Sequence, residues 1–271
     1  MKTFALFGDP VSHSLSPRFQ NAALKAAGVD AKYVAMRVAA ADLSAAVDRV
    51  RSGELAGANV TIPHKLAAFA LCDETTKEAR QVGAVNWIGL DEGGALLGDN
   101  TDARGLGAAL DEAGIRAKTV AVLGAGGAAR AAVVTLLRAG ASRIVVGARR
   151  AEQATALAEA LWSPNLVGGP METATFAAES SDLIVSAVPP AAWRDVAPAR
   201  VAAGAWICDL AYASAGTPAE QWAAARGLHS LGGLPMLLHQ GALSFEQWLE
   251  VPFPMAEARR ALGLSPARSR R

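Results

Sequence analysis

The chain has 271 residues and a formal net charge of +1, from 26 Lys and Arg against 25 Asp and Glu. This balance gives no electrostatic attraction to nucleic acid or an anionic membrane, so we expect small-molecule partners. No segment reaches the roughly 18 uninterrupted apolar residues of a membrane span, and Asp9 and Pro10 end the N-terminal apolar run before it reaches signal-peptide length. These features favour a soluble, cytoplasmic protein, either a monomer or a homodimer.

The cysteines and histidines show no pattern of a metal or disulfide site. Cys72 and Cys208 lie far apart in sequence, without the paired spacing of zinc ligands. We therefore expect no bound metal and a reducing compartment. The four histidines are expected to be structural or solvated: His13, His64, His229 and His239.

In the first part of the chain, short apolar runs alternate with alanine-rich helical segments, which is typical of α/β proteins. We predict strands over 3–7, 32–38 and 58–62 and a helix over 42–52. Parallel pairing is the default for this βαβαβ order, and ligands bind at the carboxyl ends of such strands.

The first helix carries signals for both of its ends. Ser16 is predicted to cap it, Pro17 to be its first residue and Gly28 to end it. Ser14 and Ser16 then lie at the carboxyl end of the first strand. The residues predicted to face inward are Phe19, Ala22, Ala23 and Ala26.

A second series of elements begins at Thr119, and strands near 143–148, 182–187 and 205–210 follow in doubly wound order. Two helices remain at the end of the chain, Leu237–Leu249 and Met255–Leu262, with no further strand to join the second sheet. We predict an α/β protein of two domains. Residues 1–102 with 238–271 form a substrate domain with a mainly parallel sheet, and residues 103–237 form a Rossmann-type doubly wound domain.

The segment TVAVLGAGGAAR predicts a dinucleotide site. Gly124, Gly126 and Ala129 fit the GxGxxA fingerprint between a strand and a helix, where glycines permit a tight turn and close approach of a pyrophosphate. The next strand ends at Arg149 and Arg150, with no carboxylate for a ribose 2′-hydroxyl. Guanidinium groups suit a 2′-phosphate, so NADP is favoured over NAD. Two solvated arginines are the alternative.

Polar residues follow the third predicted strand. In GANVTIPHK, Asn59 and Thr61 are two residues apart and share a face. Lys65 falls in the first turn of the next helix, where the helix dipole opposes its charge. In GDNTDARG, Asp102 ends a polar turn just before the predicted domain boundary. Taken alone, Lys65 also fits a surface lysine and Asp102 a helix cap.

Six motifs occur in order along nearly the whole chain: HSLSP (13–17), NVTIPHK (59–65), GAVN (83–86), NTD (100–102), GAGGAAR (124–130) and GLPMLLHQGALSFEQW (233–248). Together they resemble the shikimate dehydrogenase family. The resemblance implies reversible NADPH-dependent reduction of 3-dehydroshikimate to shikimate, in the biosynthesis of chorismate and the aromatic amino acids. Oxidation of the alcohol releases a proton as hydride moves to the nicotinamide, and a lysine amine can accept that proton.

The resemblance also implies roles for individual residues. Lys65 and Asp102 would form the catalytic pair. The implied substrate-binding residues are Ser14, Ser16, Asn59, Thr61, Asn86, Thr101, Tyr212 and Gln240. The implied cofactor-binding residues are Gly124, Ala125, Gly126, Gly127, Ala128, Arg149, Arg150, Leu210, Gly233 and Met236.

The chain departs from the usual family pattern at Gln20, Trp87, Ala148, Arg150 and the segment SAVPP (186–190). Quinate or an aminoshikimate is an alternative substrate, although serine at both 14 and 16 favours shikimate. A non-catalytic NADP-binding regulator would be expected to lack Lys65 or Asp102. An unrelated Rossmann module would leave the polar motifs of the first part unexplained.

Overall fold

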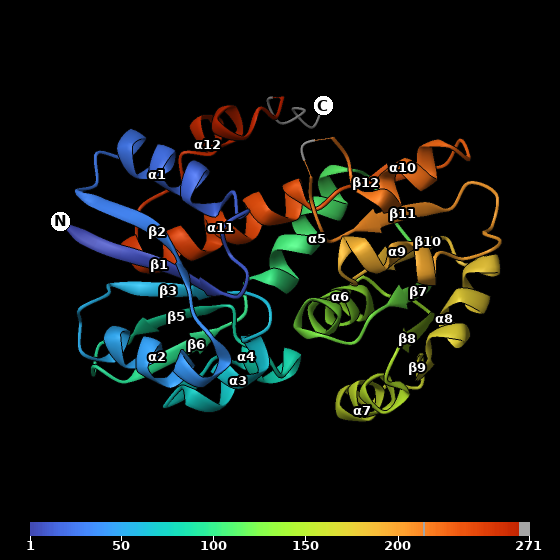
Figure 1. Cartoon of the computed structure of the whole chain (residues 1–271), viewed down its shortest axis with the longest axis horizontal. Helices are drawn as coiled ribbons and strands as arrows, with labels where there is room; N and C mark the ends of the chain where they lie inside the picture. Colours follow the sequence, from blue (N-terminus) through green and yellow to red (C-terminus); the bar gives the residue numbers. More distant parts are fainter. Residues whose placement is uncertain (214, 266–271) are drawn as a thin grey trace. The chain divides into compact units, whose positions relative to one another are not determined.

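The structure, a computed structural model, describes residues 1–213 and 215–265. The chain divides into two compact α/β units: Met1–Gly105 together with the chain from Leu237 onward, and Leu106–Met236 (Figure 1). The divisions fall at 105 and 236, against the 102 and 237 expected from sequence. They lie inside helices α5 (Asp102–Glu112) and α11 (Leu234–Leu249).

The first unit contains a six-stranded sheet in the order β2-β1-β3-β5-β6-β4. β1 pairs in parallel with β2 and β3, and β4 with β6, whereas β5 is antiparallel to both of its neighbours. The prediction of a mainly parallel sheet is therefore confirmed. The strands are β1 (Lys2–Gly8), β2 (Ala31–Arg37), β3 (Gly57–Val60), β4 (Glu74–Thr75), β5 (Trp87–Leu90) and β6 (Leu96–Asp99).

Helices cover both faces of this sheet, because the strand residues alternate between two apolar clusters (Figure 1). Ala5 and Phe7 of β1 pack with α2 (Leu43–Arg51), α3 (Lys65–Leu71) and α4 (Lys77–Val82). Phe4 and Leu6 pack on the other side with α1 (Ser16–Ala26), α11 and α12 (Met255–Leu262).

The start of α1 differs from the prediction in one respect. Ser16 is the first helical residue and not the cap, and Leu15 occupies the N-cap position. Ser14 instead bonds to the first turn of the helix, because its Oγ accepts a hydrogen bond from the backbone N–H of Ser16 at 3.2 Å. The predicted inward face is right for Phe19 and Ala23, whereas Ala22 is half-buried and Ala26, the last residue of the helix, is exposed. Gly28, predicted to end the helix, follows with φ +66°.

The second unit contains a six-stranded, wholly parallel sheet in the order β12-β11-β10-β7-β8-β9, which is the doubly wound order of a Rossmann fold. This confirms the predicted fold class. The strands are β7 (Thr119–Leu123), β8 (Arg143–Ala148), β9 (Leu166–Pro170), β10 (Leu183–Ser186), β11 (Trp206–Asp209) and β12 (His229–Leu231).

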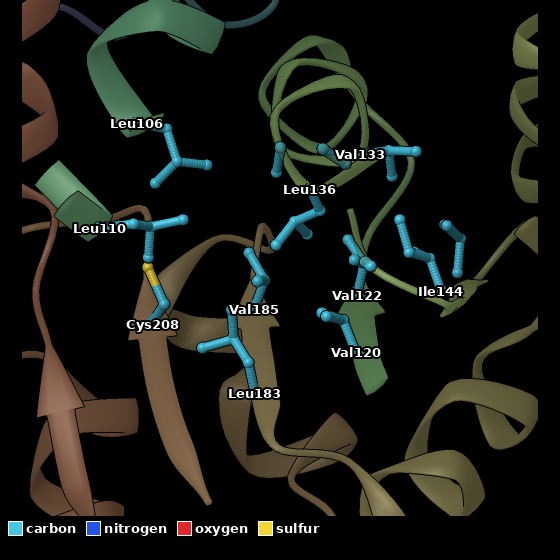
Figure 2. Packing of buried hydrophobic residues seen from close by; sticks show 14 of the residues in the cluster. Leu106, Leu110, Val120, Val122, Val133, Leu136, Ile144, Leu183, Val185 and Cys208 are labelled. Carbon is cyan, nitrogen blue, oxygen red and sulfur yellow. The ribbon is translucent and has the colours of Figure 1, made fainter. Parts of the chain in front are cut away.

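Helices pack on both faces of this sheet through two apolar clusters, one on each face. Figure 2 shows Leu106 and Leu110 of α5 and Leu136 of α6 (Gly127–Arg138) beside side chains of the central strands, including Val122 and Val185. This face also holds α7 (Ala151–Leu161), and the opposite face holds α8 (Met171–Ala177), α9 (Trp193–Val196) and α10 (Pro218–Ala224). Short 3-10 helices span Ala40–Asp42, Ala178–Ser180 and Pro190–Ala192. Among the described helices, none has the length and apolar character needed to cross a membrane.

Candidate active site

Lys65 and Asp102 form a buried ion pair in the first unit. The Lys65 Nζ donates to Asp102 Oδ2 at 2.6 Å, and the two side chains are 13% and 5% exposed. Lys65 is the first residue of α3 and Asp102 the first residue of α5. The dipole of α5 stabilises the Asp102 carboxylate, whereas the dipole of α3 destabilises the Lys65 ammonium. The direct contact with Asp102 is therefore what stabilises the charged form of Lys65.

A buried polar network adjoins the ion pair along the chain. Asn86 Nδ2 donates to Thr101 Oγ1 at 3.0 Å and to Gln240 Oε1 at 3.3 Å, while Asn86 Oδ1 accepts from the Thr101 backbone N–H at 2.7 Å. Thr101 immediately precedes Asp102, and the Val85 N–H donates to the Lys65 carbonyl. The network is therefore linked to the ion pair through the backbone at two places: Thr101 is joined to Asp102, and the segment of Val85 and Asn86 is hydrogen-bonded to Lys65.

Close contact between α5 and α11 sets the position of Gln240. A Cβ added at Gly105 would lie 2.7 Å from Cβ of Gln240 and 2.7 Å from its backbone nitrogen, closer than real Cβ atoms approach. Only glycine therefore fits at Gly105 without a shift. Since Gly105 lies one turn after Asp102, this contact brings Gln240 to the start of α5.

Two residues next to this network, Tyr33 and Ser244, were not predicted from the sequence to belong to the site. Asn59 Nδ2 donates to Ser244 Oγ at 2.9 Å, and the Tyr33 hydroxyl donates to Asn59 Oδ1 at 2.8 Å. Trp87, one of the departures from the family pattern, is only 4% exposed and donates its indole N–H to the Ser244 carbonyl at 3.2 Å. It belongs to the core that supports the network.

Three further predicted residues follow the parallel strands β1 and β3. Ser14 and Ser16 lie at the start of α1, where Ser16 is 5% exposed. Thr61 follows β3, and its Cγ2 lies 2.4 Å from where a Cβ at Gly8 would be. The segments after β1 and β3 thus lie side by side at one edge of the sheet.

In the second unit, the glycine turn has the geometry of an anion cradle. Gly124 has φ +115°, and an added Cβ would lie 2.7 Å from the Ala187 carbonyl oxygen, so glycine is required there. Gly126 is exposed, an added Cβ would meet nothing within 4 Å, and no side chain caps the helix α6 that starts at Gly127. Its backbone N–H groups are available to an anion such as a pyrophosphate.

Cationic side chains occur near this turn. The Gly124 N–H donates to Gly147 at 2.7 Å, which places the end of β8 and the exposed Arg149 and Arg150 at the same sheet edge. Arg130 in α6 has a buried Nε without a hydrogen-bond partner among the described residues, and burial lowers the pKa of its guanidinium. This cationic set fits a phosphorylated dinucleotide.

The remaining predicted residues of the second unit follow β11 or lie near the start of α11. The Gly233 N–H donates to the Ala211 carbonyl at 2.9 Å, and a Cβ at Gly233 would lie 2.5 Å from the Leu210 oxygen. Tyr212 is half-buried, and Met236 is 7% exposed within the apolar cluster.

Asp209, the last residue of β11, stabilises the turn that follows this strand. It is 1% exposed, accepts from the Ala211 N–H at 3.1 Å and receives hydrogen bonds from the hydroxyls of Ser186 and Thr217. Burial is the main reason why the pKa of Asp209 lies above its ordinary value, although these hydrogen bonds oppose the shift.

Comparison with protein families identifies three matching segments. Residues 6–88 match the shikimate dehydrogenase substrate binding domain, and residues 233–262 match the shikimate 5′-dehydrogenase C-terminal domain. Residues 119–211 match the NADP oxidoreductase, coenzyme F420-dependent family.

Similar proteins match over nearly the whole chain. Shikimate dehydrogenase (NADP(+)) of Salinibacter ruber is 40% identical, with 95% of each chain covered, and that of Magnetococcus marinus is 37% identical, covering 93% of this chain and 92% of its own. The crystal structure of shikimate 5-dehydrogenase from Thermus thermophilus in complex with NADP(H) and shikimate matches with a TM-score of 0.80 at 34% identity, covering 96% of this chain and 98% of its own.

Proposed function

Because the chain belongs to the shikimate dehydrogenase family, we propose that it catalyses the reversible NADPH-dependent reduction of 3-dehydroshikimate to shikimate. The observation that carries this proposal is the buried Lys65–Asp102 pair beside the network of Asn86, Thr101 and Gln240. An acid–base group next to several hydroxyl-binding groups suits a small polyol with one reacting alcohol.

In this proposal Lys65 moves the proton. In the reducing direction its ammonium donates a proton to the carbonyl oxygen of the substrate, and in the oxidising direction its amine accepts the proton of the alcohol. The Lys65 side chain retains 13% exposure. The proposal requires that a bound substrate reach Nζ through this exposed part of the side chain.

Asp102 holds Lys65 in place and accepts a hydrogen bond from a substrate hydroxyl. A carboxylate has two oxygens and about four acceptor positions, and the contact with Lys65 uses Oδ2. We assign the neighbouring hydroxyls of the ring to Asn86, Thr101 and Gln240. The substrate carboxylate is assigned to Ser14 and Ser16, with Thr61 nearby, whose hydroxyls can donate to an anion.

The second unit binds the cofactor in this proposal. Gly124, Gly126 and the first turn of α6 hold the pyrophosphate, and Arg149 and Arg150 bind the 2′-phosphate of NADP. When bound, NADP(H) accepts or supplies the hydride. By family resemblance, Leu210, Gly233 and Met236 contact the nicotinamide and Tyr212 contacts the substrate.

Two further features are part of the proposal. A biosynthetic reductase that uses NADPH is expected in the cytoplasm, where that cofactor is regenerated. We expect a monomer or a homodimer, and sedimentation of the purified chain distinguishes the two.

The test is an absorbance assay of NADP reduction by the purified chain, with shikimate and quinate in parallel. The proposal expects activity with shikimate and NADP, with lower kcat/KM for quinate and for NAD. Absence of turnover with shikimate would refute it, and equal kcat/KM for quinate would redefine the substrate class.

A further inference from the structure

The nitrogen and the oxygen of the Asn59 side-chain amide both hydrogen-bond to other groups of the protein. Nδ2 donates to the Asn86 carbonyl and to Ser244 Oγ, each at 2.9 Å, and Oδ1 accepts from the Tyr33 hydroxyl at 2.8 Å. A carboxamide has two N–H donors. Both are in use at 2.9 Å, so a substrate finds no free amide hydrogen on Asn59. Asn86 also has two donor contacts, but the one to Gln240 Oε1 is longer, at 3.3 Å, and a substrate hydroxyl can replace it.

Ser244 is fully buried and joins three parts of the network. Its Oγ donates to the Gln240 carbonyl at 2.9 Å, accepts from Asn59 Nδ2 and lies 3.3 Å from Thr101 Oγ1. A hydroxyl has one donor and two acceptor positions. With its hydrogen on Gln240, Ser244 accepts from Thr101, and this fixes the direction of the Thr101 hydroxyl.

That direction determines the rest of the network. When the Thr101 hydroxyl points to Ser244, its oxygen is free to accept from Asn86 Nδ2 at 3.0 Å. Without Ser244, the same hydroxyl can turn toward Asn86 Oδ1 at 3.2 Å or Gln240 Oε1 at 3.5 Å. Asn86, Thr101 and Gln240 would then present a mixture of donor and acceptor patterns to a ligand.

We propose that Tyr33, Asn59 and Ser244 form a positioning layer that fixes the hydrogen-bond pattern of Asn86, Thr101 and Gln240 without touching the substrate. The layer rests on the proposed function, because its effect is on affinity for the polyol. It reassigns Asn59, which the family resemblance grouped with the substrate-binding residues. The Lys65–Asp102 pair is a separate contact, so the layer acts on substrate binding more than on proton transfer.

The chain offers a matched control for the loss of the Ser244 hydroxyl. Ser181 in the second unit is 3% exposed, and its Oγ also donates to the carbonyl four residues earlier, that of Ala177, at 2.8 Å. Ser181→Ala therefore removes a buried hydroxyl of the same kind from the other unit. A general effect of deleting a buried serine would appear in both variants.

The experiment uses the full chain and measures kcat and the KM for shikimate at saturating NADP, the KM for NADP at saturating shikimate, and the Kd for shikimate by calorimetry without cofactor. Ser244→Ala should raise KM and Kd for shikimate about five- to tenfold, the worth of roughly one hydrogen bond. Its kcat and its KM for NADP should stay within about twofold, and Ser181→Ala should leave all four quantities near wild type. Tyr33→Phe keeps the ring packing and should raise KM about two- to fivefold.

The double variant Tyr33→Phe/Ser244→Ala should raise KM by less than the product of the single effects, because both residues act through Asn59. Unchanged KM and Kd in Ser244→Ala, with only a lower melting temperature, would show a purely structural role and overturn the layer. If Ser244→Ala does not fold, Tyr33→Phe decides by the same criteria. Failure of the wild type to bind and oxidise shikimate would refute the proposed function and the layer together, whereas an active wild type with insensitive variants refutes the layer alone.

Discussion

Replacing Lys65 with alanine should reduce turnover and stability for two separate reasons. As the proposed proton donor and acceptor, Lys65 contributes roughly 10²–10⁴ to turnover. As the counter-ion of Asp102, whose side chain is 5% exposed, it offsets the cost of burying a carboxylate. Removing one partner of a buried ion pair costs about 3–5 kcal/mol, and because Asp102 begins α5, where the helix dipole favours an anion, we expect about 3 kcal/mol.

Comparison with Lys65→Ala/Asp102→Asn separates the two effects. Lys65→Ala should lower the melting temperature by about 6–12 °C, from roughly 2–4 °C per kcal/mol for a chain of this size. The double variant should recover most of that loss, because no charge remains buried, yet stay as inactive as the single variant. Thermal unfolding by circular dichroism and the NADP-reduction assay give the two readouts.

Two results would refute this reasoning. Wild-type turnover in Lys65→Ala would remove Lys65 from proton transfer. A double variant no more stable than the single one would show that the destabilisation does not come from an unpaired carboxylate.

Other predictions concern the second unit. Arg149→Ala should weaken NADP about ten- to a hundredfold more than NAD in a fluorescence titration, the worth of a charge-assisted phosphate contact; equal losses would contradict phosphate recognition. In Gly126→Ala the added Cβ meets nothing within 4 Å, so the variant should melt like wild type, but the methyl group should hinder the pyrophosphate and weaken NADP binding. Gly124→Ala, at φ +115°, should instead lower the melting temperature. Undiminished NADP affinity in Gly126→Ala would exclude the turn as the pyrophosphate site. Asp209 has a raised folded-state pKa, so the stabilising effect of its protonated form is present below its ordinary pKa of 3.8 and is lost as pH rises. The unfolding free energy of wild type relative to Asp209→Asn should therefore fall as pH increases above about 4 in urea titrations, and a pH-independent difference would contradict this.

The sequence predicted the elements that carry strong local signals. Four strands of the second unit, β7, β8, β10 and β11, begin and end within a residue or two of the predicted positions, because each is a largely buried apolar run. The helix Met255–Leu262 matches its predicted bounds. The predicted start of α1 was wrong in detail, because the N-cap is Leu15, whose side chain makes no capping hydrogen bond, and only the backbone geometry identifies it.

Short strands escaped prediction for a physical reason. β4, β5, β6, β9 and β12 contain two to five residues each and at most two consecutive apolar residues, whereas the equally short β10 and β11 contain runs of three. β5 reads WIGL, and its Gly89 carries no side chain because the ring of Trp87 occupies that space, as an added Cβ would lie 2.6 Å from it. Such a requirement depends on packing and leaves no local signal.

Tyr33 and Ser244 were missed for a related reason. Tyr33 is followed by the apolar residues 34–36 of its strand, and Ser244 lies on a mainly apolar helix, so each has an ordinary packing interpretation. Their partner Asn59 is 26 residues from the first and 185 from the second. Only the fold brings these groups together, so the polar layer becomes visible in three dimensions alone.

The reversed direction of β5 has a consequence for engineering. Because β5 and β6 are antiparallel neighbours, Asn86 before β5 and Thr101 after β6 lie at the same end of the hairpin, and the turn over 91–95 lies at the other. Each strand has four residues, so the turn is separated from the polar network by roughly 13 Å of extended backbone. Exposed turns tolerate inserted sequence. A fluorescent label or affinity tag placed between Glu92 and Gly93, both exposed, would therefore be carried by the first unit at a distance from the polar network.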